Sequence, residues 1–396
     1  MDFGRLLTSL PFAVGKATTV IGMPKGMGMN ATKILLAGLA LGLATGAFAE
    51  ASTSETAERM PLAAQRSLVL DVTDSASRAI AVGERGHVLL SESRSEWRQV
   101  EGVPTRATLT AVTAVGNNAW AVGHDGTILG SKDGGLTWSV QREELWTQEG
   151  FDAPDWTPRY AAPLLDVMFI DAQRGYAIGA YSLLLRTEDG GESWQRVSLL
   201  AQTADQDAAA EEAGEDGADG DQWTFDADEL MLDEEEDPHL NAIARTSTGL
   251  TMIVAERGAA FRSRDDGASW ERLSLPYEGS MFGLLVLGEQ HLLAFGLRGH
   301  VQETRDGGDT WQLLDTGTEL SLMGGAALAD GGVVLVGANG VVLYRPDAEA
   351  PFAVHTFENA EGETPVLSSV LPLGSRTFLF TSDKGTARYE VPVSAP

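Results

Sequence analysis

The stretch TEDGGESW, residues 187–194, is the key to the fold because it is one of four intact copies of a short motif. The motif reads Ser/Thr-x-Asp-x-Gly-x-Ser/Thr-Trp, and the other copies occupy residues 131–138, 263–270 and 304–311. Asp and Ser/Thr side chains can hydrogen-bond the backbone of a tight turn, and Gly supplies a positive φ. The motif therefore predicts the turn of a β-hairpin, with a Trp on the outgoing strand that must pack against a neighbour and find a partner for its N–H.

Seven repeats appear when the sequence is aligned on this motif. Each predicts an apolar strand, a second strand ending near a Gly, a short turn, a third strand, the motif turn and a short fourth strand. The repeats recur about every 40 residues, except across two longer intervals. This period predicts an all-β fold, a seven-bladed β-propeller of four-stranded blades with an acidic inserted loop. The propeller should cover 66–393, closed by strands near 66–70 and 386–393.

Two insertions interrupt the repeats, at about 142–161 and 198–237. The first carries four aromatic residues, and we expect it either to fold back onto the rim or to offer an adhesive surface. The second is rich in Asp and Glu and contains no Lys or Arg. Such a composition is typical of a solvated, disordered loop, with a cation-binding or partner-binding arm as the alternative.

Residues 1–49 predict an export leader. Lys33 precedes about eleven small or apolar residues and the Ala-x-Ala cleavage pattern of residues 47–49. We assign the signal peptide to 29–49 and interpret the residues before it as the product of a start codon placed too far upstream. An uncleaved anchor is the alternative. Residues 50–65 then form an N-terminal segment of a protein expected in the periplasm.

Composition excludes several classes of function. The formal net charge of −29 argues against binding to nucleic acid or directly to anionic lipid, both of which need clustered Lys and Arg. The chain contains no Cys, so disulfides, thiol catalysis and Cys-ligated metals are excluded. A protein exported without disulfides must be held together by its apolar core.

The motif resembles the Asp-box, or BNR, repeat of sialidases and many other propellers. The whole repeat is similar to that of the photosystem II stability and assembly factor family, in the run 123–138 and in the strand RGYAIG, residues 174–179. This resemblance implies an exported, non-enzymatic scaffold that helps to assemble or stabilise a membrane-protein complex. The complex would be photosystem II, in a compartment like the thylakoid lumen, if the organism is photosynthetic, and otherwise a transporter.

Two further functions are alternatives: a glycan- or small-ligand-binding propeller, and a sialidase-like glycoside hydrolase. Sialidases need three arginines around a carboxylate and a Tyr–Glu nucleophile pair, and they carry an Arg-Ile-Pro motif. This sequence has no Arg-Ile-Pro, and none of its tyrosines has a recognisable partner Glu. Its six histidines show no metal-ligand spacing. We therefore predict no catalytic residues, no metal site and no cofactor.

The fidelity of the motif predicts a structural role for its most regular residues. The Asp should hold the turn, and the Trp should wedge neighbouring blades together. The residues concerned are Asp133, Trp138, Asp189, Trp194, Asp265, Trp270, Asp306 and Trp311.

Binding residues are predicted instead at the less uniform turns between the second and third strands. Equivalent turns of a propeller form a ring on one face, and four of the seven carry a cation: Arg85, Arg257, Arg298 and Lys384. In so acidic a chain these side chains would form a local basic patch for exported acidic segments of a membrane-protein partner. The alternative is that they are solvated turn residues.

A second set of candidates stands at the beginning of the first strand of each repeat. These positions should line the mouth of the central channel, where small ligands bind in many propellers. Their acidic and amide members are Asp71, Asp166 and Asn241. The alternative is that these side chains cap exposed backbone groups at the strand ends.

Overall fold

The computed structural model describes residues 55–60, 62, 66–144, 161–199, 237–329 and 331–392. Every described residue belongs to one compact unit, Thr53–Pro396. The predicted leader and nearly all of both predicted insertions lie outside the described residues. Within the described part of the chain, no helix is both long and apolar enough to cross a membrane.

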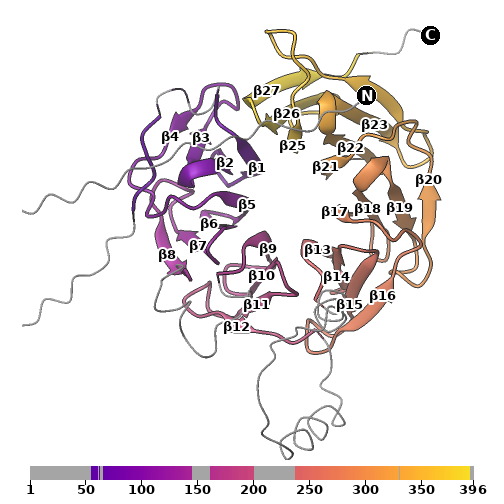
Figure 1. Cartoon of the computed structure of the whole chain (residues 1–396), viewed down its shortest axis with the longest axis horizontal. Coiled ribbons are helices and arrows are strands. Elements are labelled where there is room, and N and C mark those ends of the chain that lie inside the picture. The colour runs from indigo at the N-terminus through magenta and orange to yellow at the C-terminus, as the bar shows by residue number, and fades with distance from the viewer. Residues whose placement is uncertain are drawn as a thin grey trace, which may run out of the picture. The chain divides into compact units, whose positions relative to one another are not determined.

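Seven antiparallel sheets stand in a ring (Figure 1), and the prediction of a seven-bladed β-propeller is confirmed. The strands of each sheet follow one another in sequence order from the centre of the ring outward. The first strands lie against one another around the ring, from β1 through β5, β9, β13, β17 and β21 to β25, which again adjoins β1. Each blade is therefore one repeat of the sequence.

The strands of the first four blades are as follows. Blade 1 contains β1 (Val69–Asp74), β2 (Ala79–Gly83), β3 (Val88–Ser91) and β4 (Arg98–Gln99). Blade 2 contains β5 (Leu109–Val115), β6 (Asn118–Gly123), β7 (Ile128–Ser131) and β8 (Ser139–Arg142). Blade 3 contains β9 (Leu164–Phe169), β10 (Gly175–Gly179), β11 (Leu184–Thr187) and β12 (Gln195–Arg196). Blade 4 contains β13 (Leu240–Arg245), β14 (Thr251–Ala255), β15 (Ala259–Ser263) and β16 (Glu271–Ser274).

The remaining blades differ in their outer parts. Blade 5 contains β17 (Met281–Val286), β18 (Leu292–Gly296), β19 (Val301–Thr304) and β20 (Gln312–Leu314). Blade 6 contains β21 (Leu322–Ala327), β22 (Gly331–Gly337), β23 (Val341–Asp347) and β24 (Ala353–Thr356). Blade 7 has three strands, β25 (Leu367–Pro372), β26 (Thr377–Ser382) and β27 (Gly385–Glu390). Short 3-10 turns, η1 (Glu84–Gly86), η2 (Leu297–Gly299) and η3 (Ala338–Gly340), join the second and third strands of blades 1, 5 and 6.

The second strand of each blade is more buried than the first. Every residue of β10 is buried, whereas β9 alternates between buried and half-buried positions. The second strand is more completely covered because it has a strand on each side and a neighbouring blade on each face, whereas the first strand has one side toward the channel.

The apolar core is divided among the interfaces between blades. Each cluster of buried side chains draws on two neighbouring blades: Ile80 and Leu90 of blade 1, for example, pack with Leu109 and Trp138 of blade 2. Clusters of this kind occur at all seven interfaces of the described ring. A single blade therefore has no core of its own, as expected for a repeat fold.

The closing strands predicted near 66–70 and 386–393 each overlap a strand of the structure. The first range overlaps β1, which begins at Val69 and belongs to blade 1, and the second overlaps β27, the outer strand of blade 7. Closure in the described structure comes from β1 lying beside β25. Ser368 Oγ donates to the Val69 carbonyl at 2.7 Å, and Ser369 Oγ donates to the Asp71 carboxylate at 2.8 Å.

Candidate functional site

Successive turns of an antiparallel blade alternate between the two faces of the ring. We call one of them the motif face, because it carries the turns 131–138, 187–194, 263–270 and 304–311. The opposite face carries the turns between second and third strands and the connections from one blade to the next. We call it the tip face, after the residues at the tips of those turns: Arg85, Asp125, Tyr181, Arg257, Arg298, Asn339 and Lys384.

Each motif turn is built from the same hydrogen bonds. The Ser193 N–H and hydroxyl donate to the Asp189 carboxylate at 2.9 and 2.5 Å, and the Gly191 N–H donates to Thr187 Oγ1 at 2.9 Å. The bonds from Ser193 favour the charged form and lower the pKa of Asp189 to about 2. The same pattern surrounds Asp133, Asp265 and Asp306.

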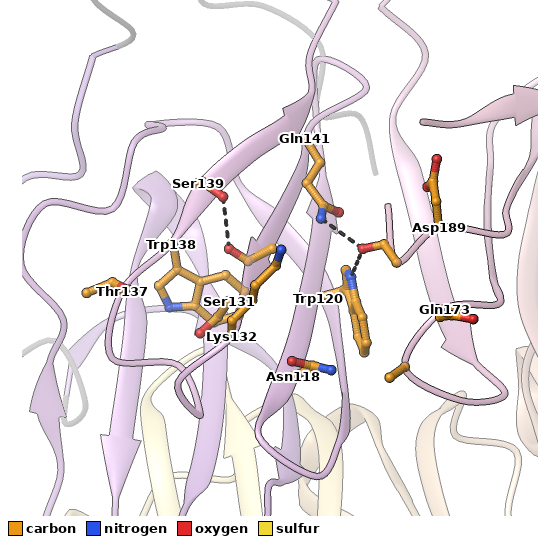
Figure 2. Close-up of a pocket in the computed structure, with 13 residues that line it drawn as sticks. Asn118, Trp120, Ser131, Lys132, Thr137, Trp138, Ser139, Gln141, Gln173 and Asp189 are labelled. Atoms are coloured by element: carbon orange, nitrogen blue, oxygen red, sulfur yellow. Dashed lines mark hydrogen bonds between the residues drawn. The ribbon is translucent and has the colours of Figure 1, made fainter. Parts of the chain in front are cut away.

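The preceding blade also holds each motif turn. Figure 2 shows the arrangement between blades 2 and 3, where the Trp120 ring N–H and the Gln141 amide donate to the Gly190 carbonyl at 2.9 and 3.0 Å. Carbonyls of the other motif turns accept equivalent bonds, from Arg78 to Gly134 (3.1 Å), from Tyr176 to Asp266 (2.8 Å) and from Arg262 to Gly307 (2.8 Å). The sequence motif therefore serves as a latch between blades. The sequence did not identify the residues that hold it, because they lie one repeat away and are not of one type.

The Trp of each motif lies in the interface with the preceding blade, as the wedge prediction requires. Trp138, Trp194, Trp270 and Trp311 each join the core cluster shared with that blade. Only Trp138 satisfies its ring N–H in the expected local way, by donating to the Gly135 carbonyl at 2.9 Å. The ring N–H groups of the other three are buried without a partner among the described residues.

A cleft of about 530 Å³ opens on the motif face between blades 2 and 3 (Figure 2). Its lining includes Trp120, Trp138 and Gln141. The two indole rings are only 3% and 9% exposed, and Trp120 stacks on Phe169 with ring centroids 3.5 Å apart. The aromatic faces are thus used in packing and are not presented to a sugar ring.

The tip face has a backbone that is unusually constrained. In six of the seven turns the tip residue adopts a left-handed conformation, with φ between 51° and 56°. In five of these six turns the next residue is Gly, and after Tyr181 it is Ser182. A side chain has no room at Gly299, where a Cβ would lie 2.2 Å from the Thr318 carbonyl oxygen. Left-handed backbone is unfavourable for residues other than Gly and is often retained where function requires it. The tip side chains are therefore carried on a fixed ring of turns.

The three arginines of the tip face differ in their surroundings. Arg85 lies 3.9 Å from Glu84 and 4.0 Å from Glu58, in exposed pairs that contribute little energy. Arg257 and Arg298 are also exposed. No acid among the described residues forms an ion pair with Arg298. The structure thus places three cations on one face, and their role in binding stays a prediction.

The turn that carries Lys384 is not equivalent to the turns of the three arginines, although the sequence alignment placed them together. This turn is shorter, because Ser382 and Gly385 are already paired across the hairpin and only two residues lie between them. The side chain of Lys384 lies 3.5 Å from the Glu363 carboxylate, and its backbone is not left-handed. Lys384 is therefore on the same face but not equivalent to the three arginines.

The channel-mouth residues occupy two neighbouring positions and not one. Each first strand begins with a β-bulge, and the unpaired residues are Leu70, Thr110, Leu165, Asn241, Phe282, Met323 and Ser368. Asp71 and Asp166 stand one residue beyond the bulge. Alignment by sequence treated them as equivalent to Asn241 because a bulge adds a residue without changing the apolar pattern.

These polar side chains join neighbouring blades. Asn241 donates to the Met281 carbonyl at 3.0 Å, Asp71 accepts from the Val112 N–H at 2.8 Å, and Asp166 accepts from the Ile243 N–H at 2.9 Å. The arrangement matches the alternative that they cap backbone groups, here across a blade boundary. A ligand-binding role for the three residues stays a prediction.

The pKa of the Asp166 carboxyl is strongly raised. Burial raises its pKa to about 7, against the opposing effect of the hydrogen bond from Ile243, and the Asp71 carboxylate adds to the rise. Burial also raises the pKa of Asp71. The two groups therefore influence each other across the inner wall of the ring, and a second negative charge there is unfavourable near neutral pH.

A buried ion-pair cluster replaces the motif at the interface of blades 5 and 6. Glu303 accepts from His291 at 2.9 Å and pairs with Arg345 at 3.2 Å, while both members of that pair are buried. Hydrogen bonds from His291 and Arg345 outweigh burial and lower the pKa of Glu303. In the described part of the chain, no three His, Cys, Asp or Glu side chains are grouped so that they could hold a metal ion.

Solved structures of other propellers share this architecture. YCF48 from Cyanidioschyzon merolae is 15% identical, with a TM-score of 0.57 over 84% of this chain and 98% of that one. A structure of YCF48 bound to D1 peptide also has a TM-score of 0.57, at 15% identity over 83% of this chain and 95% of that one. The WD40 propeller domain of Doa1 is 14% identical, with a TM-score of 0.55 over 85% of this chain and 95% of the other.

At 14–15% sequence identity, these likenesses show a shared fold and nothing beyond it. No family model matches the chain, and no curated protein matches its sequence. Membership of a family, including the Asp-box repeat family, therefore stays a prediction.

Proposed function

We propose that this chain is a non-enzymatic, exported propeller scaffold that binds another protein through its tip face. The observation that carries the proposal is the ring of left-handed turns, which holds Arg85, Arg257 and Arg298 outward on a fixed backbone in a chain of net charge −29. A local cationic surface on an acidic protein steers and orients an acidic partner. The partner class is an exported acidic segment of a membrane-protein complex.

Two further observations support this proposal. One structural neighbour of this chain, YCF48, has been solved with a bound peptide. The repeats also resemble those of photosystem II stability and assembly factors, which favours a role in assembling or stabilising a membrane complex. The complex would be a photosystem in a photosynthetic organism and a transporter in another bacterium.

The test is capture of partners from solubilised membranes by the tagged chain. Reversing the charge of two tip residues, with Arg257→Glu and Arg298→Glu together, should abolish capture of a membrane complex. The matched control reverses two charges on the motif face, with Lys132→Glu and Arg264→Glu, and should leave capture unchanged. Equal capture by both folded variants would show that the tip arginines do not bind the partner.

Glycan or small-ligand binding is the second candidate, favoured by the polar side chains at the channel mouth. Binding to a glycan array that depends on Asn241 would support it. Hydrolysis of a fluorogenic sialoside would instead indicate a sialidase-like enzyme, the third candidate.

A further inference from the structure

The cleft between blades 2 and 3 lies beside a glycine that replaces a long side chain of other blades. Gly130 is the third-strand residue directly before the motif Ser131. The same position in blades 3, 4 and 5 is occupied by Arg186, Arg262 and Glu303. Blade 2 therefore contributes no side chain at this point of its interface with blade 3.

Arg262 shows what a long side chain does at this position. It pairs with Glu271 of its own blade at 2.8 Å and donates to the Gly307 carbonyl of blade 5 at 2.8 Å, and its side chain is only 7% exposed. The space between blades 4 and 5 is thus occupied by this arginine. In blade 2 the counterparts of Arg262 and Glu271 are Gly130 and Ser139, and the corresponding space is the cleft of about 530 Å³.

Side chains with unused hydrogen-bonding groups line this cleft. Asn118 stands on the blade 2 wall and Gln173 on the blade 3 wall (Figure 2). Asn118 is half-buried and Gln173 is exposed, and neither side-chain amide has a hydrogen-bond partner among the described residues. Each amide provides both donors and an acceptor. The two walls therefore offer donors and acceptors to a molecule held between them.

The charged groups of the lining are already paired. The lining contains one cation, Lys132, and one carboxylate, Asp189. Lys132 lies 3.7 Å from Glu192, and the Asp189 carboxylate accepts hydrogen bonds from Ser193 and Thr187 within its own turn. Neither charge lacks a partner that an ionic ligand would supply. An apolar ligand would leave the wall amides without partners. A neutral ligand with several hydroxyl groups meets both conditions.

We propose that the cleft binds a small, neutral, polyhydroxylated ligand such as a disaccharide. Its volume lies within the range of about 300–1,000 Å³ typical of small-molecule sites. Hydroxyl groups both donate and accept, so they can pair with the amides of Asn118 and Gln173. Because the indole face of Trp120 packs on Phe169, hydrogen bonds to the walls hold the ligand in place of ring stacking. The site is independent of the tip face and of the channel mouth.

A titration of the full chain, followed by saturation-transfer NMR, tests the proposal with cellobiose, maltose and lactose as probes. We expect saturable binding of at least one of them, with a Kd of about 1 mM or tighter. Gln173→Ala and Asn118→Ala should each weaken binding about fivefold or more, because each removes one set of hydrogen bonds to the ligand.

The matched control is Gln290→Ala. Gln290 is exposed and holds the equivalent place between blades 4 and 5. Its carbonyl accepts from the Gly307 N–H at 2.9 Å, as the Gln173 carbonyl accepts from the Gly190 N–H at 2.8 Å. Since Arg262 occupies the space beside it, this variant should bind the sugar within about twofold of wild type.

Gly130→Arg tests the origin of the cleft. An arginine here places in blade 2 the side chain that occupies the space in blade 4, and it should abolish binding. It has to displace Gln141, since a Cβ on Gly130 would lie 2.5 Å from Gln141 Nε2, the end of a flexible side chain. If its melting temperature shows that this variant does not fold, the substitution of the exposed Gln173 and its control carry the test.

No saturable binding of any of the three sugars to the wild type, or equal affinity of the wild type, Gln173→Ala and Gly130→Arg, would overturn the proposal. Binding that is lost in Asn241→Ala and kept in Gly130→Arg would place the ligand at the channel mouth and would overturn it too. The tip-face variant with Arg257→Glu and Arg298→Glu should bind the sugar normally. Failure of this proposal is therefore distinguishable from failure of the proposed function.

Discussion

The motif face and the tip face of the ring use turns in opposite ways. On the motif face, one pattern of hydrogen bonds recurs around Asp133, Asp189, Asp265 and Asp306, and a side chain of the preceding blade holds each turn. On the tip face, the backbone of six turns is nearly the same, but the tip residues are basic, acidic, aromatic and amide. Regular side chains accompany the contacts between blades, and varied side chains occupy the surface that no blade covers.

This difference leads us to expect that stability and partner binding depend on different faces of the ring. A change on the motif face breaks a contact between two blades, and the core itself consists of such contacts. A substitution at the tip of a turn alters an exposed side chain. The backbone of that turn is held by contacts that do not involve this side chain. Substitutions on the two faces should therefore affect different measurements.

The largest expected loss of stability on the motif face follows Arg262→Ala. The Arg262 side chain is 7% exposed and donates to the Gly307 carbonyl at 2.8 Å, to Asp309 at 2.6 Å and to Glu271 at 2.8 Å. Removal of this side chain leaves the buried Gly307 carbonyl without its hydrogen bond from Arg262 and leaves a cavity between blades 4 and 5. We expect the free energy of unfolding, measured by denaturant titration, to fall by about 2–3 kcal/mol.

The neighbouring Arg264 provides a matched control. It contacts the same Asp309 at 3.2 Å but is 49% exposed. Arg264→Ala should change the free energy of unfolding by less than about 0.5 kcal/mol. Partner capture by the folded fraction should be unchanged in both variants, and loss of capture in the folded Arg262 variant would break the separation of the two faces.

A smaller, pH-dependent effect is expected from Asp166→Asn on the inner wall. Since burial raises the pKa of Asp166 to about 7, the folded protein holds a proton that the unfolded chain releases near pH 4. The stabilisation from this proton is complete below about pH 4 and is lost as the pH rises through about 7. Asn keeps a carbonyl acceptor for Ile243 and does not titrate, so the variant should exceed wild type by about 2 kcal/mol at about pH 8.

The measurement is the free energy of unfolding from about pH 5 to pH 8 for the wild type and the variant. The difference between them should grow with pH across this interval. Parallel curves would show that Asp166 does not hold a proton in the folded state, and the inner wall would then tolerate both charges of Asp71 and Asp166.

The smallest effect on stability is expected from Arg298→Gly. Gly adopts the left-handed backbone of this position, φ 55°, without a steric cost, although it also increases the entropy of the unfolded chain. We expect a gain of about 0.5 kcal/mol or no change in the free energy of unfolding, together with weaker partner capture. A clear loss of stability would mean that the Arg298 side chain supports the fold, which would weaken the contrast between the faces.

The repeated motif was sufficient to predict the propeller, because each copy encodes a turn by contacts within eight residues. Ser263, Asp265 and Ser269 complete their hydrogen bonds with one another and with the turn's own backbone. The number of blades and the wedge role of the Trp followed, since a Trp on a short strand has to pack against something outside its own turn.

The partners of the motif could not be predicted in the same way. The same task is performed at four interfaces by three residue types: Arg78 and Arg262, Trp120, and Tyr176. A carbonyl oxygen accepts from any correctly placed donor, so the sequence carries no common signal for this contact.

Three features depended on the tertiary structure alone. The bulge that separates Asp71 and Asp166 from the position of Asn241 changes the pairing of a strand without changing its apolar pattern. The short turn of Lys384 and the three-stranded sheet described for the last blade depend on which strands pair there. The sequence by itself determined the repeating unit, because its turns are local. The joining of these units and the closure of the ring were decided by contacts between residues far apart in the chain.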